Sequence, residues 1–149
     1  MSSPQVPKPP AASVPCVLLT DIGRDIDDTL ALAAAAGLQR RGALDLVGII
    51  ATGGGASKRA DLARVWLEIL GENFLPTSPP IPVASDLDGP GPEGCSAPPA
   101  SMAALSPSPR SPLHPGPAHE LLLDLARRHP GELEIFAIAP MSSLAAAIG

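Results

Sequence analysis

Three short apolar runs, separated by segments with helical periodicity, most strongly constrain what this chain can fold into. They lie at residues 17–19, 47–50 and 135–138, and each has the length of a strand rather than of a membrane-spanning helix. Near-continuous apolar strands of this kind are typical of parallel sheets buried on both faces. The chain reads strand, helix, strand, helix, strand, a long interruption, helix, strand and the start of a helix. We therefore predict an α/β fold with a mostly parallel, Rossmann-like sheet flanked by helices.

Four aspartates crowd the turn between the first predicted strand and the helix that follows it. Asp21 leaves the strand, Asp25 lies in the turn, and Asp27 and Asp28 open the helix. Aspartate is favoured at a helix amino terminus by capping and by the helix dipole, which accounts for one or two of the four. Carboxylate oxygens are the ligands that Ca²⁺ and Mg²⁺ prefer. The cluster therefore indicates a site for a hard cation at the carboxyl end of the strand.

The string Asp-Ile-Gly-x-Asp-Ile-Asp-Asp-x-Leu-Ala-Leu at residues 21–32 resembles the amino-terminal signature of the inosine–uridine nucleoside hydrolases. Residues 44–84 contain, in order, segments that resemble the family's second strand, second helix and third strand. Residues 129–144 resemble the family's strand that ends in Gly-Pro-Leu-Thr-Asn-Leu. The matches span most of residues 14–149, so this part of the chain is expected to form one nucleoside hydrolase-like domain.

The resemblance implies Ca²⁺-dependent hydrolysis of the N-glycosidic bond of a ribonucleoside to base and ribose. Asp21 would ligate Ca²⁺ and act as general base on a water molecule that the ion holds. Asp28 would ligate the ion through both carboxylate oxygens, and Asp27 would accept a hydrogen bond from a ribose hydroxyl. Ser142 stands where the family has a threonine whose backbone carbonyl is a ligand, so the lost methyl group should matter little. Asp21, Thr52 and Ser142 each lie just beyond a predicted strand, so they are expected to meet at the carboxyl ends of the parallel strands.

The chain departs from the family pattern at several positions. Leu19 stands where the family usually has a further Asp, Ser143 stands where it has Asn, and the loop at residues 52–55 lacks a frequent Asn. The chain, with 149 residues, is much shorter than a complete hydrolase of this family. Nothing in it resembles the carboxyl-terminal portion, where a further Asp ligand and a His for leaving-group activation are expected. We therefore expect an amino-terminal half whose sheet is incomplete at the carboxyl end. A catalytically dead fragment that binds only a cation or a partner is the alternative function.

A second family is an alternative on motif grounds. Residues 25–30 resemble the Asp-x-Asp-x-Thr-Leu motif of the haloacid-dehalogenase-type phosphatases, in which Asp25 would be the nucleophile and Asp27 the general acid. That chemistry requires the nucleophile directly at the end of a buried strand, whereas residues 21–24 intervene here. In the hydrolase interpretation, Asp25 is either a group that supports the ligands or a solvated residue at the helix entrance.

The charge of the chain excludes several partners. The formal net charge is −5 and the isoelectric point is near 5.0, whereas nucleic acids and anionic membranes require clustered Lys and Arg. Lys58, Arg59 and Arg64 come close to a cluster, but on the predicted helix at residues 58–70 we expect them to form a solvated face. We predict a small-molecule ribonucleoside as partner, no nucleic acid and no membrane. An exposed edge of an incomplete sheet would also favour a homo-oligomer.

The remaining segments carry smaller expectations. Residues 1–13 lack the apolar core of a signal peptide and are expected to be a disordered tail, which favours a cytoplasmic location. Residues 86–117 are rich in Pro, Ser, Gly and Ala, which predicts a low-complexity insertion that is either a lid or a linker, with His114 solvated. Cys16 is expected to be buried. Trp66 is interpreted as core packing rather than as a platform for stacking a base.

Overall fold

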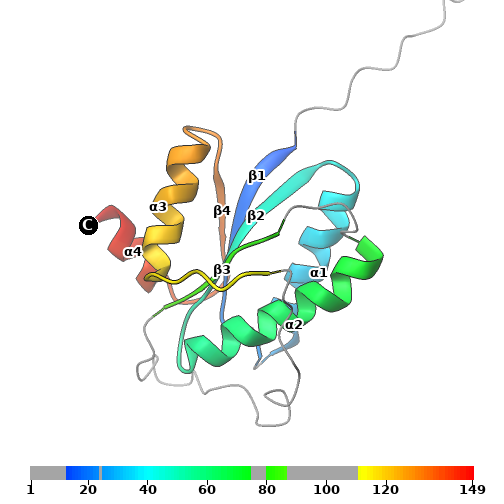
Figure 1. Ribbon diagram of the computed structural model, residues 1–149, viewed down its shortest axis with the longest axis horizontal. Helices are drawn as coiled ribbons and strands as arrows, with labels where there is room; N and C mark the ends of the chain where they lie inside the picture. Colours follow the sequence, from blue (N-terminus) through cyan, green and yellow to red (C-terminus); the bar gives the residue numbers. More distant parts are fainter. Residues whose placement is uncertain (1–12, 24, 75–79, 87–110) are drawn as a thin grey trace, which may run out of the picture.

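The computed structural model describes residues 13–23, 25–74, 80–86 and 111–149 of the chain. Four parallel strands form one sheet in the order β3-β2-β1-β4, with helices on both faces (Figure 1). This architecture confirms the predicted α/β fold. The elements are β1 (Val14–Thr20), α1 (Ile26–Arg40), β2 (Leu44–Ala51), α2 (Ala56–Phe74), β3 (Val83–Ser85), α3 (Ala118–Arg128), β4 (Glu134–Ala137) and α4 (Ser142–Ile148).

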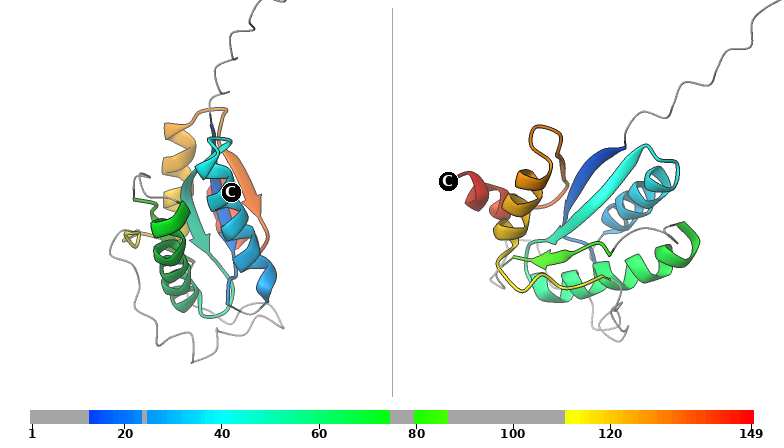
Figure 2. Two further views of the ribbon diagram at one scale, coloured as in Figure 1. Left: turned by 90° about the vertical axis from the view of Figure 1, so that its right-hand side faces the viewer. Right: turned by 45° about the horizontal axis from the view of Figure 1, so that its top comes forward.

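The central strand β1 is buried on both faces. Leu18 belongs to the core under α1 and α2, while Val17 and Leu19 belong to the core under α3 and α4. Successive side chains of a strand point to opposite faces, so a strand between two helix layers needs apolar residues at every position. Figure 2 shows the two further views of this arrangement. The uninterrupted apolar run in the sequence is thus explained by the position of β1 in the middle of the fold.

The chain changes direction across the sheet between β3 and β4. β1, β2 and β3 follow one another outward on one side of β1, and α3 returns the chain so that β4 pairs on the other side. In open α/β sheets, ligands bind beyond the carboxyl ends of the strands at the point where the strand order reverses. The fold therefore directs attention to the turns that follow β1 and β4.

Residues 112–114 form a short extended segment that covers the edge of the sheet at β3. The Val83 N–H donates to the Pro112 carbonyl at 3.0 Å, and the His114 N–H donates to the Val83 carbonyl at 2.8 Å. The expectation that His114 is solvated is therefore wrong: the residue is half-buried, and its Nε2 is shielded from solvent without a hydrogen-bond partner among the described residues. Backbone pairing with β3 holds this segment against the sheet.

The opposite edge is open within the described part of the chain, where β4 pairs with β1 alone. The prediction that this strand is buried on both faces is wrong, because Ile135, Phe136 and Ile138 are 39%, 53% and 43% exposed. An apolar hollow of about 210 Å³ lies beside it, between α1, β1 and β4, and its lining includes Phe136, Ile138, Cys16 and Leu38. The apolar pattern of residues 135–138 matches that of β1. Among the described strands, however, β4 has a neighbour on one side only, whereas β1 lies between two strands.

Other expectations agree with the structure or lie outside it. Cys16 is buried, and Trp66 packs against the core under α1 and α2. The helix α2 is longer at both ends than the predicted one at 58–70. Among the described residues, no helix combines the length and the apolar character that a membrane span requires. Residues 1–12 and 87–110 lie outside the described residues, so the tail and most of the proposed insertion stay predictions.

Candidate functional site

The turn after β1 carries the first candidate site residues. β1 ends at Thr20, Asp21 follows as a half-buried residue, and α1 begins at Ile26. Gly23 adopts φ +113°, a conformation that glycine reaches without the steric cost that other residues meet. The glycine lets the chain turn sharply from the strand into the helix. Asp21 is thereby placed directly beyond the carboxyl end of the central strand.

Asp28 is the most buried of the candidate carboxylates, with 4% of its surface exposed. Its Oδ1 accepts a hydrogen bond from Thr20 Oγ1 at 2.6 Å, and Thr20 Oγ1 accepts one from the Ile22 N–H at 3.2 Å. Burial raises the pKa of Asp28; the Thr20 hydrogen bond opposes this, while the charges of Asp21 and Asp27 add to it. The ionised carboxylate is therefore costly at this position unless a positive charge lies beside it.

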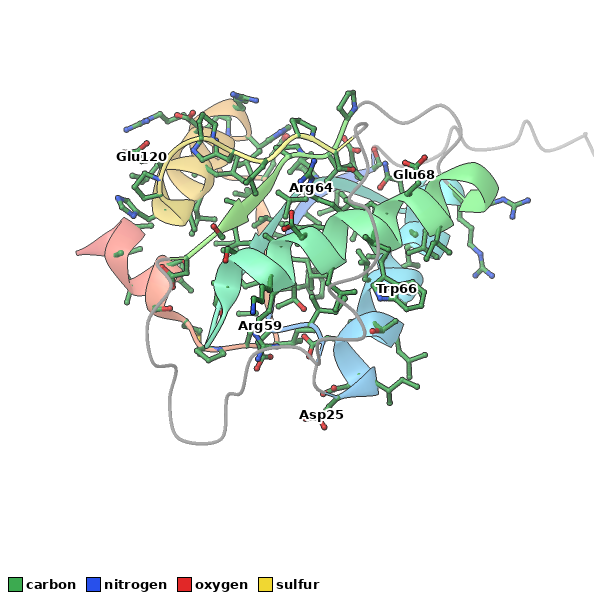
Figure 3. All side chains as sticks on the ribbon, turned by 60° about the horizontal axis from the view of Figure 1, so that its bottom comes forward. Asp25, Arg59, Arg64, Trp66, Glu68 and Glu120 are labelled. Carbon is green, nitrogen blue, oxygen red and sulfur yellow. The ribbon has the colours of Figure 1, made fainter. Side chains whose placement is uncertain are left out.

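Asp25 and Asp27 lie at the outer end of the same turn. Both are exposed, and Asp25 occupies the N-cap position of α1 without a side-chain capping bond (Figure 3). Asp27 lies in the first turn of α1, as predicted. A solvent-facing carboxylate here is accessible to a polar ligand, while Asp28 faces the interior.

Ser142 lies at the same end of the sheet, as the first residue of α4 after β4. It is exposed, and its Oγ donates a hydrogen bond to Oδ2 of Asp86, the residue that follows β3. The Asp86 N–H donates to the Ala51 carbonyl at 2.8 Å, which anchors Asp86 at the end of β2. Sequence analysis missed Asp86 because it stands at the border of the proposed insertion. Its position directly after the third predicted strand was the available signal.

The loop after β2 lies beside the turn after β1. The Thr52 N–H donates to the Thr20 carbonyl at 3.0 Å, which extends the pairing of the two strands by one residue. Thr52 is fully buried, and its Oγ1 has no hydrogen-bond partner among the residues that the structure describes. Gly53 and Gly55 have φ +82° and +70°, so this glycine run forms a defined turn that other residues would strain.

These residues share the carboxyl edge of the sheet, but they do not form a ready-made metal cluster. In the described ranges, no group of three or more His, Cys, Asp or Glu side chains is arranged to hold one metal ion. Instead of one cluster, the structure brings together two separate pairs of residues. Asp21 and Asp28 are close enough for the charge of the first to raise the pKa of the second, and Ser142 is joined to Asp86 instead.

Arg59 is a further residue whose predicted position is wrong. We expected it on a solvated face with Lys58, yet Arg59 is 0% exposed whereas Lys58 is exposed. Its Nη1 donates to the carbonyls of Asp21 and Ile22, the latter at 2.9 Å, and its Nε donates to the carbonyl of Gly54 at 2.9 Å. Figure 3 shows Arg59 near the amino-terminal end of α2. The guanidinium can be buried because backbone carbonyls of two turns replace the water it loses.

The fold and the acidic turn define a Rossmann-like α/β protein with an oxygen-rich site at its switch point. The chain belongs to the nucleoside hydrolase family, since residues 16–149 match the family described as inosine-uridine preferring nucleoside hydrolase. The resemblance noted from the sequence is thus confirmed. The phosphatase interpretation is wrong, because β1 ends at Thr20 and Asp25 lies exposed at the entrance of α1 rather than at the end of a strand.

Solved structures agree with this assignment over part of their length. The type III effector protein XopQ, complexed with adenosine diphosphate ribose, has a TM-score of 0.74 and 27% identity over 93% of this chain and 39% of that one. The effector protein XOO4466 has a TM-score of 0.71 and 25% identity, with 93% and 39% covered. A purine-preferring ribonucleoside hydrolase from Gardnerella vaginalis shares the fold, with a TM-score of 0.66, 22% identity, and 90% and 43% covered. The chain thus spans 39–43% of the length of these proteins. A search of the curated proteins found no match.

Proposed function

We propose that this chain contributes the amino-terminal part of a Ca²⁺-dependent nucleoside hydrolase site, which hydrolyses the N-glycosidic bond of a ribonucleoside to base and ribose. The observation that carries the proposal is the pair Asp21 and Asp28 at the switch point of the sheet. One carboxylate is buried and held by Thr20, and the other lies half-buried beside it. Family membership supplies the reaction class.

The donor chemistry of this edge fits Ca²⁺. The candidate ligands are the carboxylates of Asp21 and Asp28 and the backbone carbonyl of Ser142, all oxygen donors, which Ca²⁺ prefers to nitrogen or sulfur. Asp28 provides the test of fit: it is buried, its pKa is raised, and the neighbouring charges that act on it are negative. A cation between the carboxylates would remove both the burial cost and the mutual repulsion. Water would complete the coordination.

Each residue of the turn has a distinct proposed role. Bound Ca²⁺ would orient the ribose diol and make the attacking water more acidic. By the family resemblance, Asp21, which lies directly beyond the strand end, would take the proton of that water. Asp27, exposed in the first turn of α1, would accept a hydrogen bond from a ribose hydroxyl. Asp86, which accepts the hydroxyl hydrogen bond of Ser142, would help to fix the first turn of α4.

The departing base also needs a proton. The resemblance assigns this step to a histidine in a portion of the family that this chain does not match, and we assign it to no residue here. A relative that keeps a cation site without catalysis is the second candidate, favoured by Leu19 and Ser143, which stand where the family usually has Asp and Asn.

A calorimetric titration of the full chain with Ca²⁺ tests the proposal. It compares the wild type with Asp28→Asn and with Asp124→Asn, in which an exposed aspartate of α3 that pairs with Arg127 is changed instead. The titrations are repeated with inosine, ribose and adenosine diphosphate ribose, which share a ribose. We expect Ca²⁺ binding that a ribose-bearing ligand strengthens, that Asp28→Asn abolishes and that Asp124→Asn leaves unchanged.

The other outcomes are equally decisive. A folded wild type that binds no Ca²⁺ refutes the proposed site. Binding that survives Asp28→Asn places the ion elsewhere. Ca²⁺ binding that no ribose-bearing ligand alters favours the second candidate, a cation-binding relative without hydrolase activity.

A further inference from the structure

Arg59 of α2 joins the two turns that follow β1 and β2. Its guanidinium donates to the carbonyls of Asp21 and Ile22 in the first turn and to that of Gly54 in the second. The side chain has no exposed surface. One buried cation therefore contacts the backbone of a candidate ligand, Asp21, and the backbone of the loop next to it.

The chemistry of arginine makes this contact a constraint on geometry. The guanidinium is planar and presents its donors in a fixed fork, whereas a lysine ammonium is a compact charge at the end of a flexible chain. A carbonyl that moved out of reach would leave a buried charged donor unsatisfied, which costs more than an exposed hydrogen bond. The carbonyl of Asp21 is thus held in place, and with it the backbone from which the Asp21 carboxylate projects.

A residue that only stabilises the packing of α2 would behave differently, and the same helix offers one for comparison. Arg64 also donates to a backbone carbonyl, that of Ser111, through Nε at 2.7 Å, and it pairs with Asp61 at 3.1 Å. Neither contact involves the turns after β1 and β2. Figure 3 labels Arg59 and Arg64 on α2. Arg64 is therefore a matched control for Arg59.

We propose that Arg59 is a positioning residue that holds the turn after β1 in the conformation in which Asp21 and Asp28 share a cation. The part that concerns the cation rests on the proposed function, whereas the part that concerns the backbone of the turn does not. Removing a residue that orients a metal ligand, without itself binding the metal, typically lowers metal affinity by about 10–100-fold. That range is the expected size of the effect on Ca²⁺ affinity.

The experiment compares Arg59→Lys, Arg59→Met and Arg64→Met in the full chain. Amide hydrogen exchange is read at Ile22, whose N–H donates to Thr20 Oγ1 within the turn, and Ca²⁺ affinity is read by calorimetry. We expect the Ile22 amide to exchange at least about tenfold faster in both Arg59 variants and at the wild-type rate in Arg64→Met. We expect Ca²⁺ affinity to fall by about 10–100-fold in the Arg59 variants alone.

Each outcome decides one part of the inference. Unchanged exchange at Ile22 in a folded Arg59→Lys overturns it, whether or not the wild type binds Ca²⁺. If the wild type binds Ca²⁺, an equal Ca²⁺ affinity of Arg59→Lys overturns the part of the inference that concerns the cation. Faster exchange in a chain whose wild type binds no Ca²⁺ refutes the proposed function but retains Arg59 as the residue that fixes the turn. If Arg59→Met does not fold, Arg59→Lys decides, because it retains the charge.

Discussion

Two buried threonines at neighbouring strand ends should respond in opposite ways to the same isosteric change. Thr20 ends β1, and Thr52 follows β2; both are fully buried. Thr20 Oγ1 donates to Asp28 at 2.6 Å and accepts the Ile22 N–H at 3.2 Å. Thr52 Oγ1 has no partner among the described residues. Valine replaces a hydroxyl by a methyl group with little change in shape, so Thr20→Val and Thr52→Val isolate the hydroxyl in each place.

The hydrogen bonds set the expected magnitudes. A hydrogen bond to a charged group contributes about 1.5–3 kcal/mol, and a buried donor left unsatisfied costs about 1–3 kcal/mol. Thr20→Val removes the hydrogen bond to Asp28 and leaves the Ile22 N–H unsatisfied. Because these two contributions overlap in part, we expect the substitution to lower the free energy of unfolding by about 2–4 kcal/mol. Thr52→Val breaks no hydrogen bond and removes an unpaired hydroxyl from the core. It should be neutral or should stabilise the fold by up to about 1 kcal/mol.

Urea unfolding at neutral pH with a chelator provides the assay. Trp66, the single tryptophan, packs against the core and gives a fluorescence signal to compare with circular dichroism. Coincident transitions and an unchanged m-value license the comparison of unfolding free energies. Adding Asp28→Asn completes a double-mutant cycle with Thr20→Val, for which we expect a coupling energy of about 0.5–3 kcal/mol.

Equal effects of the two valine substitutions would refute the reasoning. So would a larger loss from Thr52→Val than from Thr20→Val, because that result would mean that the Thr52 hydroxyl is satisfied. The amide oxygen of the Asn variant can still accept the Thr20 hydrogen bond, so a coupling energy near zero would show that the charge of Asp28 adds nothing to that bond.

Three further predictions concern charge, space and reactivity. Burial raises the pKa of Asp28, so the folded state binds its proton more tightly than the unfolded state; stability from this group is present at low pH and lost as the pH rises through the folded pKa. With a chelator present, the Asp28→Asn variant should therefore be more stable than the wild type at pH 7. The difference in stability should shrink as the pH falls toward 3.8, the ordinary pKa of an aspartate. Equal thermal stability of the two proteins at pH 7 would contradict this. A Cβ at Gly48 would lie 2.7 Å from Cδ1 of Leu125, so Gly48→Ala should cost about 1–3 kcal/mol in urea unfolding, and a stabilised variant would show that the core adapts freely. Burial, and then the charge of Glu134, raises the pKa of Cys16 to about 11. In a Cys95→Ser background, the Cys16 thiol of the folded protein should therefore resist iodoacetamide at pH 8, whereas the unfolded protein in urea should react. Equal reaction rates of the folded and the unfolded protein would show an accessible thiolate.

The sequence was a good guide where local pattern decides structure. The apolar run of β1 predicts a strand that Asp21 leaves, and the structure confirms that the strand ends at Thr20. The partner of Asp28 was not predictable, because the bond to Thr20 depends on how α1 packs back on β1. The apolar run in β4 resembles that of β1, but burial depends on neighbours that a single run does not encode.

Arg59 shows why charged residues on helices are hard to place. Its burial depends on the carbonyls of two turns that meet at one point, and the turn at Asp21 and Ile22 is 38 and 37 residues away in sequence. No local pattern distinguishes it from exposed Lys58. The domain boundaries, the cytoplasmic location and the homo-oligomer stay predictions. So do the roles of the four site residues Asp21, Asp27, Asp28 and Ser142.

Within the described part of the chain, the open edge of the sheet at β4 lies next to the candidate site. β4 borders the switch point, carries the exposed side chain of Phe136, and leads directly to Ser142. A strand that added to this edge, from any source, would cover the apolar hollow beside β4 and bring new side chains next to the turn after β1. The association that covers the edge would then be the same event that adds side chains to the candidate site. If the proposed function holds, such an association would make the specific activity rise with protein concentration and saturate as the edge is filled.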